Sequence, residues 1–179
     1  RGLGRLKPVP EARIDGRFAS PIGISIDSDA RDGAHVFMGR LIRGVRNGPS
    51  PRWLQDRLKA IGLRPISALV DITNYFTYDR NRPLHVFDAD KVSGDLRIHR
   101  TAGGEQMLAL DERAYTLPAG VLVFSDAGGV QSIAGIMGGE ATGCTDGTVN
   151  VLLEAALWNH VQIARAGRAL RIHSDARYR

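Results

Sequence analysis

The sequence carries one nearly continuous apolar run, Val151-Leu152-Leu153-Glu154-Ala155-Ala156-Leu157, which we expect to decide the fold. Apolar runs of this length are typical of strands that are buried on both faces of a sheet. The run therefore predicts a buried strand over residues 150–157. Asn159 follows shortly after it and is a favourable N-cap, which predicts a helix from there to about Leu170.

Shorter patterns on either side predict further strands and helices. Apolar or alternating segments predict strands at residues 22–26, 34–43, 96–101, 106–110, 115–117, 121–125 and 130–137. Helical spacing predicts one helix from Ser50 to Gly62, with Ser50 as N-cap, and another from Pro65 to about Tyr78. The predicted class is α+β, in which short strands form mixed or antiparallel sheets around a barrel-like core with about three helices.

Proline and glycine suggest where the folded domain begins. Residues 1–33 are expected to form a linker or extended arm from a preceding domain, interrupted by Pro8, Pro10, Gly16 and Pro21. Residues 34–179 are expected to form the domain itself, as one unit or as two interleaved subdomains that share a core. Because the chain opens without an initiator Met, we interpret it as a fragment of a longer protein.

Composition narrows the class of protein. With 179 residues, of which 43% are hydrophobic, the chain can bury one good core of a soluble globular protein. No apolar run approaches the roughly 20 residues of a membrane-spanning helix, so we expect no membrane association. Cys144 is the only cysteine, which excludes an internal disulfide and suits a cytoplasmic protein.

Charge is distributed unevenly along the chain. Residues 1–64 carry 13 Lys/Arg and 6 Asp/Glu, residues 65–154 carry 6 and 12, and residues 155–179 carry 5 and 1. Basic ends around an acidic middle predict a polyanion or an acidic partner that approaches from one side. The alternative is that these arginines are solvated side chains on helices and loops.

Glu154 is the candidate site residue that the pattern itself singles out. Its apolar neighbours favour burial, and a buried carboxylate is unfavourable unless a donor satisfies it. Such a group often marks a ligand contact. Alternatively, Glu154 lies on the solvent-facing side of a half-exposed strand.

His85 is a second candidate, placed by the sequence in a turn after Pro83. The spacing His85, Asp88, Asp90 could form a metal site, but zinc and iron require more nitrogen or sulfur donors than this. We predict no metal. The imidazole could position water, contact substrate or act as a general base, or it could hold the loop through hydrogen bonds.

A glycine-rich turn, Gly135-Ile136-Met137-Gly138-Gly139, follows a predicted strand. Glycines let backbone N–H groups approach a ligand or a developing oxyanion. The alternative is a tight hairpin that needs positive φ. No phosphate-binding or dinucleotide-binding glycine motif accompanies it.

Four segments carry a family resemblance, with the motifs Leu-Val-Asp-Ile-Thr-Asn-Tyr (69–75), Pro-Leu-His-Val-Phe-Asp-Ala-Asp (83–90), Ala-Gly-Ile-Met-Gly-Gly (134–139) and Leu-Glu-Ala-Ala (153–156). Their order and spacing resemble the editing (B3/B4) module of the bacterial phenylalanyl-tRNA synthetase β subunit. The resemblance implies a parent (αβ)₂ enzyme that charges phenylalanine tRNA with ATP and Mg²⁺ at a site on the α subunit. The module itself is expected to need no cofactor.

The resemblance also implies the site residues of an editing hydrolase that removes tyrosine from phenylalanine tRNA. The implied catalytic residues are His85, Thr73 and Gly138. The implied substrate-binding residues are Glu154, Arg64, Gly139, Ser174 and Ala176. In this scheme Glu154 accepts a hydrogen bond from the tyrosine hydroxyl, and bulk at Ser174 or Ala176 blocks entry.

One departure from the family pattern adds charge beside this site. Asn81-Arg82 stands where a glycine-containing turn is more usual, and it puts a basic side chain near the expected mouth. The editing reading predicts direct attack by water, without a covalent intermediate. Two alternatives stay open: a non-catalytic tRNA-binding or scaffold module of the same synthetase, and a free amino-acid sensor.

Overall fold

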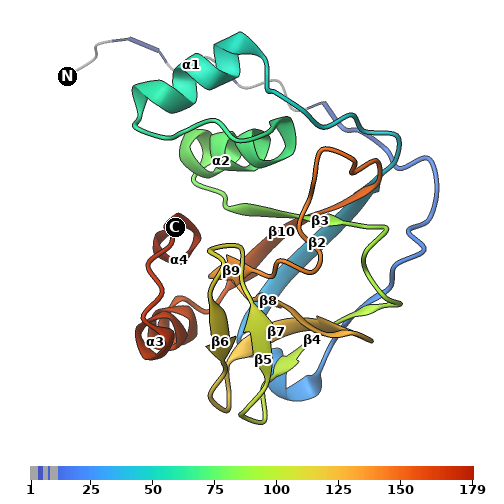
Figure 1. The fold of residues 1–179 in the computed structure, drawn as a ribbon, viewed down its shortest axis with the longest axis vertical. Coiled ribbons are helices and arrows are strands. Elements are labelled where there is room, and N and C mark those ends of the chain that lie inside the picture. The colour runs from blue at the N-terminus through green and yellow to red at the C-terminus, as the bar shows by residue number, and fades with distance from the viewer. Residues whose placement is uncertain (1–3, 6–7, 9–11) are drawn as a thin grey trace.

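The structure is a computed structural model that describes residues 4–5, 8 and 12–179. The predicted arm falls partly outside the described residues, at 1–3, 6–7 and 9–11. Residues 12–23 have no regular secondary structure, after which the chain forms β1 (Ile24–Ile26) and a 3₁₀ helix, η1 (Ser28–Ala30) (Figure 1). The boundary at residue 34 stays a prediction.

The predicted apolar strand is the middle strand of an antiparallel sheet. This strand, β10 (Val151–Trp158), lies between β2 (Ala34–Ile42) and β3 (Leu84–Asp88) (Figure 1). Val151 and Leu152 are buried, whereas Leu157 near the other end is exposed. The predicted strand is therefore confirmed. The predicted burial is confirmed only for the first half of the strand.

A second, five-stranded sheet has the order β1-β4-β7-β8-β9. Its remaining strands are β4 (Leu96–Arg100), β7 (Leu122–Asp126), β8 (Gly129–Ile133) and β9 (Met137–Gly138). Only the β1–β4 pair is parallel among the pairs of this sheet. A separate hairpin joins β5 (Gln106–Leu108) to β6 (Ala114–Thr116), with Glu112 at a positive φ of 63° in its turn.

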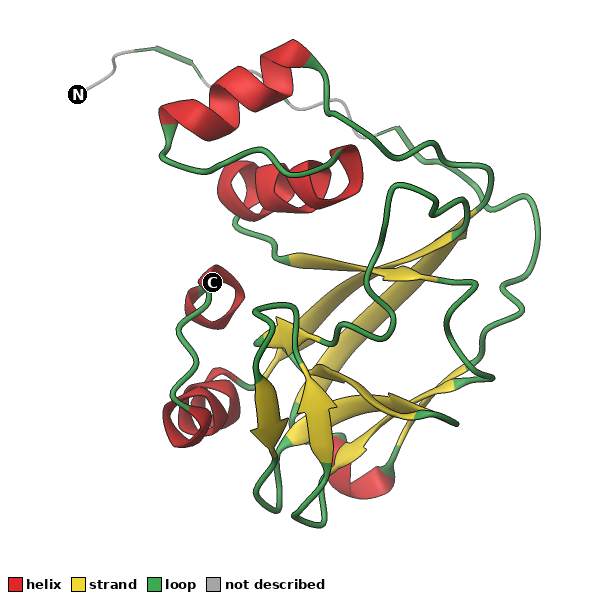
Figure 2. Ribbon diagram, in the orientation of Figure 1, coloured by secondary structure: helices red, strands yellow, loops and turns green. Residues whose placement is uncertain are grey.

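The α+β class and the mixed, short-stranded sheets are confirmed, but the expected barrel does not form. Among the described residues the strands make three separate sheets, and none of them closes (Figure 2). Closure needs hydrogen bonds between the two edges of one sheet. Here β9 is two residues long and ends the five-stranded sheet without pairing to β1 at the other edge.

One strand prediction and one turn prediction were wrong. Residues 130–137 form no single strand, because Gly135 has a φ of 66° and turns the chain back between β8 and β9. A β-carbon on Gly135 would lie 2.7 Å from Cδ1 of Trp158, so this turn needs glycine. His85 does not lie in a turn either: it belongs to β3, which gains its hydrogen bonds from β10.

Within the described chain there are four α-helices rather than about three. The first two are α1 (Arg52–Ala60) and α2 (Ala68–Arg80), and α1 lies on the outer side of α2 (Figure 1). Ser50 does not cap α1, since its hydroxyl donates instead to the buried carboxylate of Asp71 in α2. None of the helices in the described part of the chain is both long and apolar enough to span a membrane.

The C-terminal helices follow directly after β10. Asn159 accepts hydrogen bonds from the N–H groups of Val161 and Gln162 and caps α3 (His160–Leu170), which confirms that prediction. The additional helix is α4 (Asp175–Tyr178), a single turn capped by Ser174. Its end brings the C-terminus into the space between α2 and α3 (Figure 1).

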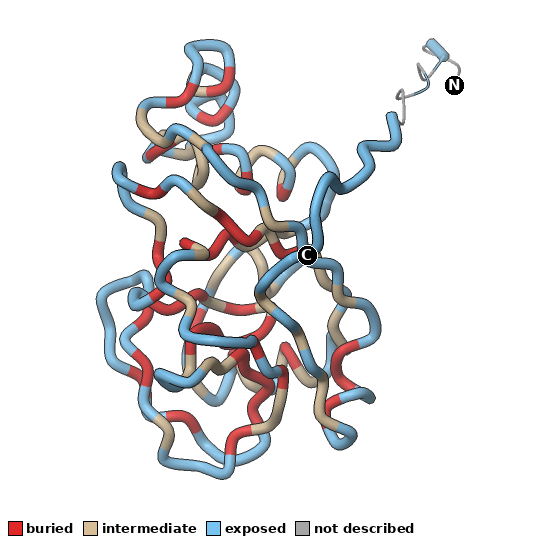
Figure 3. Tube along the Cα trace, turned by 90° about the vertical axis from the view of Figure 1, so that its right-hand side faces the viewer, coloured by how far each residue is buried: buried red, intermediate tan, exposed pale blue. Residues whose placement is uncertain are grey.

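Two clusters of buried apolar side chains hold these layers together. Figure 3 marks the buried residues along the chain in red. One cluster lies between the two larger sheets and includes Phe87, Phe124 and Leu152. The other lies between the five-stranded sheet, the β5–β6 hairpin and α3, and includes Val123 and Ile163. Burial of these side chains supplies the main favourable free energy of folding.

Candidate functional site

A cavity of about 400 Å³ opens between α2, β3, β10, the β8–β9 turn and the C-terminal segment. Six of the eight predicted site residues line it: Thr73, His85, Gly138, Glu154, Ser174 and Ala176. These residues come from five different segments that the sequence separates by up to 103 positions. The cavity volume lies in the range of small-molecule sites.

Glu154 and His85 lie directly opposite each other on β10 and β3. Opposed residues of antiparallel strands project to the same face with Cβ atoms about 5 Å apart. Glu154 is only 6% exposed, so the solvent-facing alternative is wrong. Burial raises the pKa of its carboxyl group to about 8, and no hydrogen bond to this carboxyl forms among the described residues. The group is therefore largely neutral at pH 7.

His85 presents an unsatisfied imidazole to the cavity. Its Nε2 atom is buried and has no hydrogen-bond partner in the described part of the chain. Burial lowers the pKa of the imidazole to about 4, so the ring is neutral at pH 7 and one nitrogen can accept a proton. The ring packs edge-on against Phe87, with centroids 4.3 Å apart. His85 therefore does not hold a loop in place through hydrogen bonds of its Nε2 atom.

Gly138 allows His85 to occupy this position. A β-carbon at Gly138 would lie 2.3 Å from Cε1 and 3.0 Å from Nε2 of the imidazole. Any larger residue would push the ring from its place. The glycine therefore gives the cavity a wall of bare backbone directly beside a neutral imidazole.

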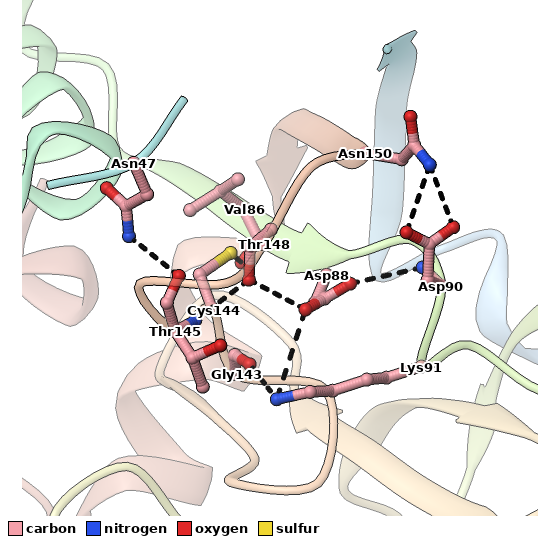
Figure 4. Close-up of polar contacts among 10 residues, drawn as sticks. All are labelled: Asn47, Val86, Asp88, Asp90, Lys91, Gly143, Cys144, Thr145, Thr148 and Asn150. Atoms are coloured by element: carbon pink, nitrogen blue, oxygen red, sulfur yellow. Dashed lines mark hydrogen bonds and ion pairs between the residues drawn. The ribbon is translucent and has the colours of Figure 1, made fainter. Parts of the chain in front are cut away.

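Asp88 and Asp90 have structural contacts and do not assemble a metal site with His85. Asp88 accepts a hydrogen bond from Thr148 at 2.7 Å, and Asn150 donates to Asp90 at 3.0 Å (Figure 4). Asp88 also lies three residues from His85 on one strand, which places the two on opposite faces. Across the described residues, no group of three or more His, Cys, Asp or Glu side chains is arranged to hold a metal ion.

This network instead holds the loop that forms part of the cavity wall. Lys91 donates to the carbonyl of Gly143 at 2.7 Å, and Gly143 and Cys144 both line the cavity (Figure 4). Burial, with a further contribution from Asp88, raises the pKa of the Cys144 thiol to about 11. The thiol is therefore protonated at neutral pH and unsuited to act as a nucleophile.

The two hydroxyl groups of the predicted set are engaged with backbone carbonyls. Thr73 donates to Val70 at 2.8 Å, and Ser174 donates to Ile136 at 2.7 Å. The Ser174 hydrogen bond fixes the start of α4 to the β8–β9 turn. This contact positions Ala176, the second residue of α4, at the edge of the cavity. Each hydroxyl oxygen has two lone pairs, and that of Ser174 already accepts a hydrogen bond from the N–H of Arg177.

Arg64 and Gly139 lie outside the cavity lining. Arg64 is exposed in the connection between α1 and α2. The Gly139 N–H donates to Gln131 at 2.8 Å, and a β-carbon there would lie 2.7 Å from the same carbonyl oxygen. Gly139 therefore packs against β8. Direct contact of either residue with a substrate stays a prediction.

Sequence reasoning missed most of the basic side chains at the cavity. Four basic residues line the cavity: Arg82, Arg177, Arg179 and His160. The sequence pointed only to Arg82, because Asn81-Arg82 replaces the glycine-containing turn that is usual in the family. The others come from α3 and α4, whose position depends on the long return of the chain from β10. A close-packed feature fixes one of them: Arg177 lies across Gly167, where a β-carbon would be 2.5 Å from its Nε.

Comparison with known proteins identifies the family. The profile of the B3/4 domain matches residues 33–179. The chain belongs to the B3/4 domain family. It is 68% identical to a phenylalanine–tRNA ligase beta subunit from Ruegeria pomeroyi over 179 residues, and 58% identical to one from Cereibacter sphaeroides over 180 residues. The predicted resemblance is confirmed.

The B3/4 domain corresponds to a limited part of these relatives. The matches cover 100% of this chain but 22% of each relative, so the chain spans about a fifth of their length. An N-terminal fragment of the phenylalanyl-tRNA synthetase beta subunit from Pyrococcus horikoshii has a similar fold, with a TM-score of 0.60 over 90% of this chain and 51% of that one. At 16% identity this likeness concerns the fold alone.

Proposed function

We propose that this B3/4 domain is the editing module of a phenylalanine–tRNA ligase β subunit and hydrolyses the ester that joins tyrosine to phenylalanine tRNA. The observation that carries the proposal is the buried, unpartnered Glu154 carboxyl, opposed by an unpartnered His85 in one cavity. Buried polar groups without partners are rare, and they are typical of ligand sites.

The chemistry of the cavity suits a second selective site, which would hydrolyse the tyrosyl ester that the aminoacylation site fails to exclude. A pocket built for phenylalanine discriminates poorly against a ring with one added hydroxyl, so a separate hydrolytic site is useful. At Glu154 the tyrosine hydroxyl would satisfy a buried carboxyl group, whereas phenylalanine would leave it unpaired at a cost of about 1–3 kcal/mol. This range corresponds to a preference of about tenfold to a few hundredfold.

The groups around the cavity favour direct attack by water. The Thr73 and Ser174 hydroxyls are engaged with carbonyls, and the Cys144 thiol is protonated, so none is an activated nucleophile. A neutral His85 can accept a hydrogen bond from the attacking water and take its proton. The backbone at Gly138 would face the ester carbonyl. The ester is reactive, so orientation of water and carbonyl can supply much of the rate enhancement.

The wider setting follows from the proposed family role. The domain would act within an (αβ)₂ ligase in the cytoplasm, with phenylalanine tRNA and the α subunit as partners. ATP and Mg²⁺ would serve the aminoacylation reaction outside this chain. The basic ends of the chain also support a second candidate, a module that holds tRNA without hydrolysis.

Deacylation of tyrosyl-tRNA specific for phenylalanine tests the proposal. The 179-residue chain and the full ligase would each be assayed as wild type and as Glu154→Ala, with phenylalanyl-tRNA as the matched substrate. We expect selective release of tyrosine that falls at least about tenfold in the variant. If the full ligase binds both tRNAs but releases neither amino acid, the binding module becomes the better assignment.

A further inference from the structure

The mouth of the cavity is basic, whereas the buried carboxyl of Glu154 inside the cavity is largely neutral at pH 7. The exposed residues that line it include three basic side chains, Arg82, Arg179 and His160. They also include one acidic side chain, Asp175. Asp175 is already engaged, since its hydrogen bond with the Tyr78 hydroxyl is the main reason that the Tyr78 pKa is raised. The mouth therefore has an excess of positive charge, because three arginines line the cavity beside the single charged carboxylate of Asp175.

Arg82 has the weakest contacts with the rest of the protein among the arginines at the cavity. It follows Asn81, which ends α2 in a left-handed conformation with φ 51° and ψ 38°, and it directly precedes Pro83 and β3. Its guanidinium donates to the carbonyl of Ala156 at 3.4 Å, which is long for a hydrogen bond. It forms no ion pair among the described residues, whereas nearby Arg80 is paired with Asp79 at 2.9 Å.

The other cations at the cavity have more extensive contacts. Arg179 stacks on the ring of Tyr78, with Cζ 4.3 Å from the centroid. Arg177 donates to the carbonyl of Ile172 at 2.6 Å. Four of the five N–H donors of Arg82 remain available for a ligand, in a fork that matches two oxygens of a phosphate.

The position of Arg82 along β10 sets what it can reach. Glu154 and Ala156 are two residues apart on this strand, a separation of about 7 Å. A tyrosyl group whose hydroxyl meets Glu154 would extend along this direction and bring its ester to the level of Ala156. The nucleotide attached to the ester would then lie farther out, beside Arg82.

We propose that Arg82 binds the phosphodiester group on the 5′ side of the terminal nucleoside of the aminoacylated tRNA. This inference rests on the proposed function, because that function supplies the ester-linked nucleotide. Phosphate is the anion nearest to the ester in such a substrate. Binding there would order the terminal nucleotide at the mouth of the cavity.

Two stable ligands test the phosphate contact directly: 3′-tyrosylamino-3′-deoxyadenosine with and without a 5′-phosphate. Their amide bond resists hydrolysis, so affinity is measured by calorimetry apart from catalysis. The protein is the full ligase, with its aminoacylation site occupied by a phenylalanyl-adenylate analogue. Wild type, Arg82→Gln and Arg80→Gln are compared. Arg80 is the matched control, since it is a neighbouring arginine that is ion-paired and does not line the cavity.

We expect the 5′-phosphate to tighten binding by about tenfold in wild type and in Arg80→Gln, and to have no effect in Arg82→Gln. The salt dependence of binding should also weaken in Arg82→Gln alone. Equal affinity of wild type for the two ligands, no binding of either, or a phosphate preference retained in Arg82→Gln would overturn the inference. The corresponding pair of phenylalanyl ligands separates the two proposals. If this pair binds as tightly as the tyrosyl pair and shows the same phosphate preference, only the editing function is contradicted.

Discussion

Gly138 and His85 are in such close contact that a β-carbon on the glycine would lie 2.3 Å from Cε1 of the imidazole. The backbone of β9 and the ring on β3 thus form adjoining walls of one cavity, although 53 positions separate them in sequence. Only a residue without a side chain permits this arrangement. The contact makes the position of the imidazole sensitive to a single methyl group.

Replacement Gly138→Ala should displace the His85 ring into the cavity. We expect ester hydrolysis to fall at least tenfold, while stability drops by about 1–3 kcal/mol from local overpacking. Deacylation rates and chemical denaturation would measure the two effects. Gly147→Ala is the matched control, because its new β-carbon would meet only the Thr145 side chain at 3.8 Å. Unchanged hydrolysis in Gly138→Ala would show that the ring position does not matter.

Glu154 should make the protein less stable as pH rises. Its carboxyl has a pKa of about 8 in the folded state and about 4.5 when unfolded. The unfolded state therefore releases its proton first, and folding stability declines between pH 4.5 and 8 and then levels off. The full decline is on the order of a few kcal/mol.

The variant Glu154→Gln should lack this decline, because an amide does not titrate. Urea unfolding at pH 5 and pH 8.5 would compare it with wild type. The variant should gain stability relative to wild type at the higher pH. A parallel pH dependence of the two proteins would mean that the buried carboxyl does not carry the raised pKa.

His85 should destabilise the protein in acid. The pKa of its imidazole is about 4 in the folded state, below the ordinary 6.5, so the unfolded state takes up a proton first as pH falls. Stability is lost between pH 6.5 and 4. NMR titration should show no protonation of His85 near pH 6.5, and His85→Asn should remove its share of the acid destabilisation. A His85 resonance that titrates near pH 6.5 would contradict the assigned environment.

Bulk at Ala176 should close the cavity without unfolding the domain. Ala176 is half-buried on the single-turn helix α4 and lines the cavity. We expect Ala176→Trp to abolish tyrosine release while the melting temperature stays within a few degrees. Ala169→Trp, at an exposed position of α3 outside the cavity, provides the comparison. Hydrolysis that survives in Ala176→Trp would place the reaction elsewhere.

Local chemistry was enough to predict the elements that depend on neighbouring residues. The apolar run at β10 and the Asn159 cap of α3 are both confirmed, because strand burial and capping are encoded within a few positions. Ser50 shows the limit of this reasoning. A serine before proline favours a cap, yet its hydroxyl binds the buried Asp71 on the next helix, where an unpaired carboxylate would be costly.

The elements that depend on distant partners were the ones missed. β3 has little alternation of its own and forms because β10 offers a complete set of hydrogen-bond partners. The expected barrel failed for a related reason, since closure is decided by whether two sheet edges meet. Residues of the family motifs were found, but only the fold separates those at the cavity from Arg64 and Gly139.

The α+β class, the family and the presence of a carboxylate inside an apolar strand can all be predicted from the amino-acid sequence alone. The burial of Glu154, its position opposite His85 and the presence of Arg82 at the same cavity become visible only in the folded chain. This difference follows from the periodicity of a strand. Alternation shows which residues share a face. What covers that face comes from segments far away along the chain, and their docking sets the burial and pKa of each group.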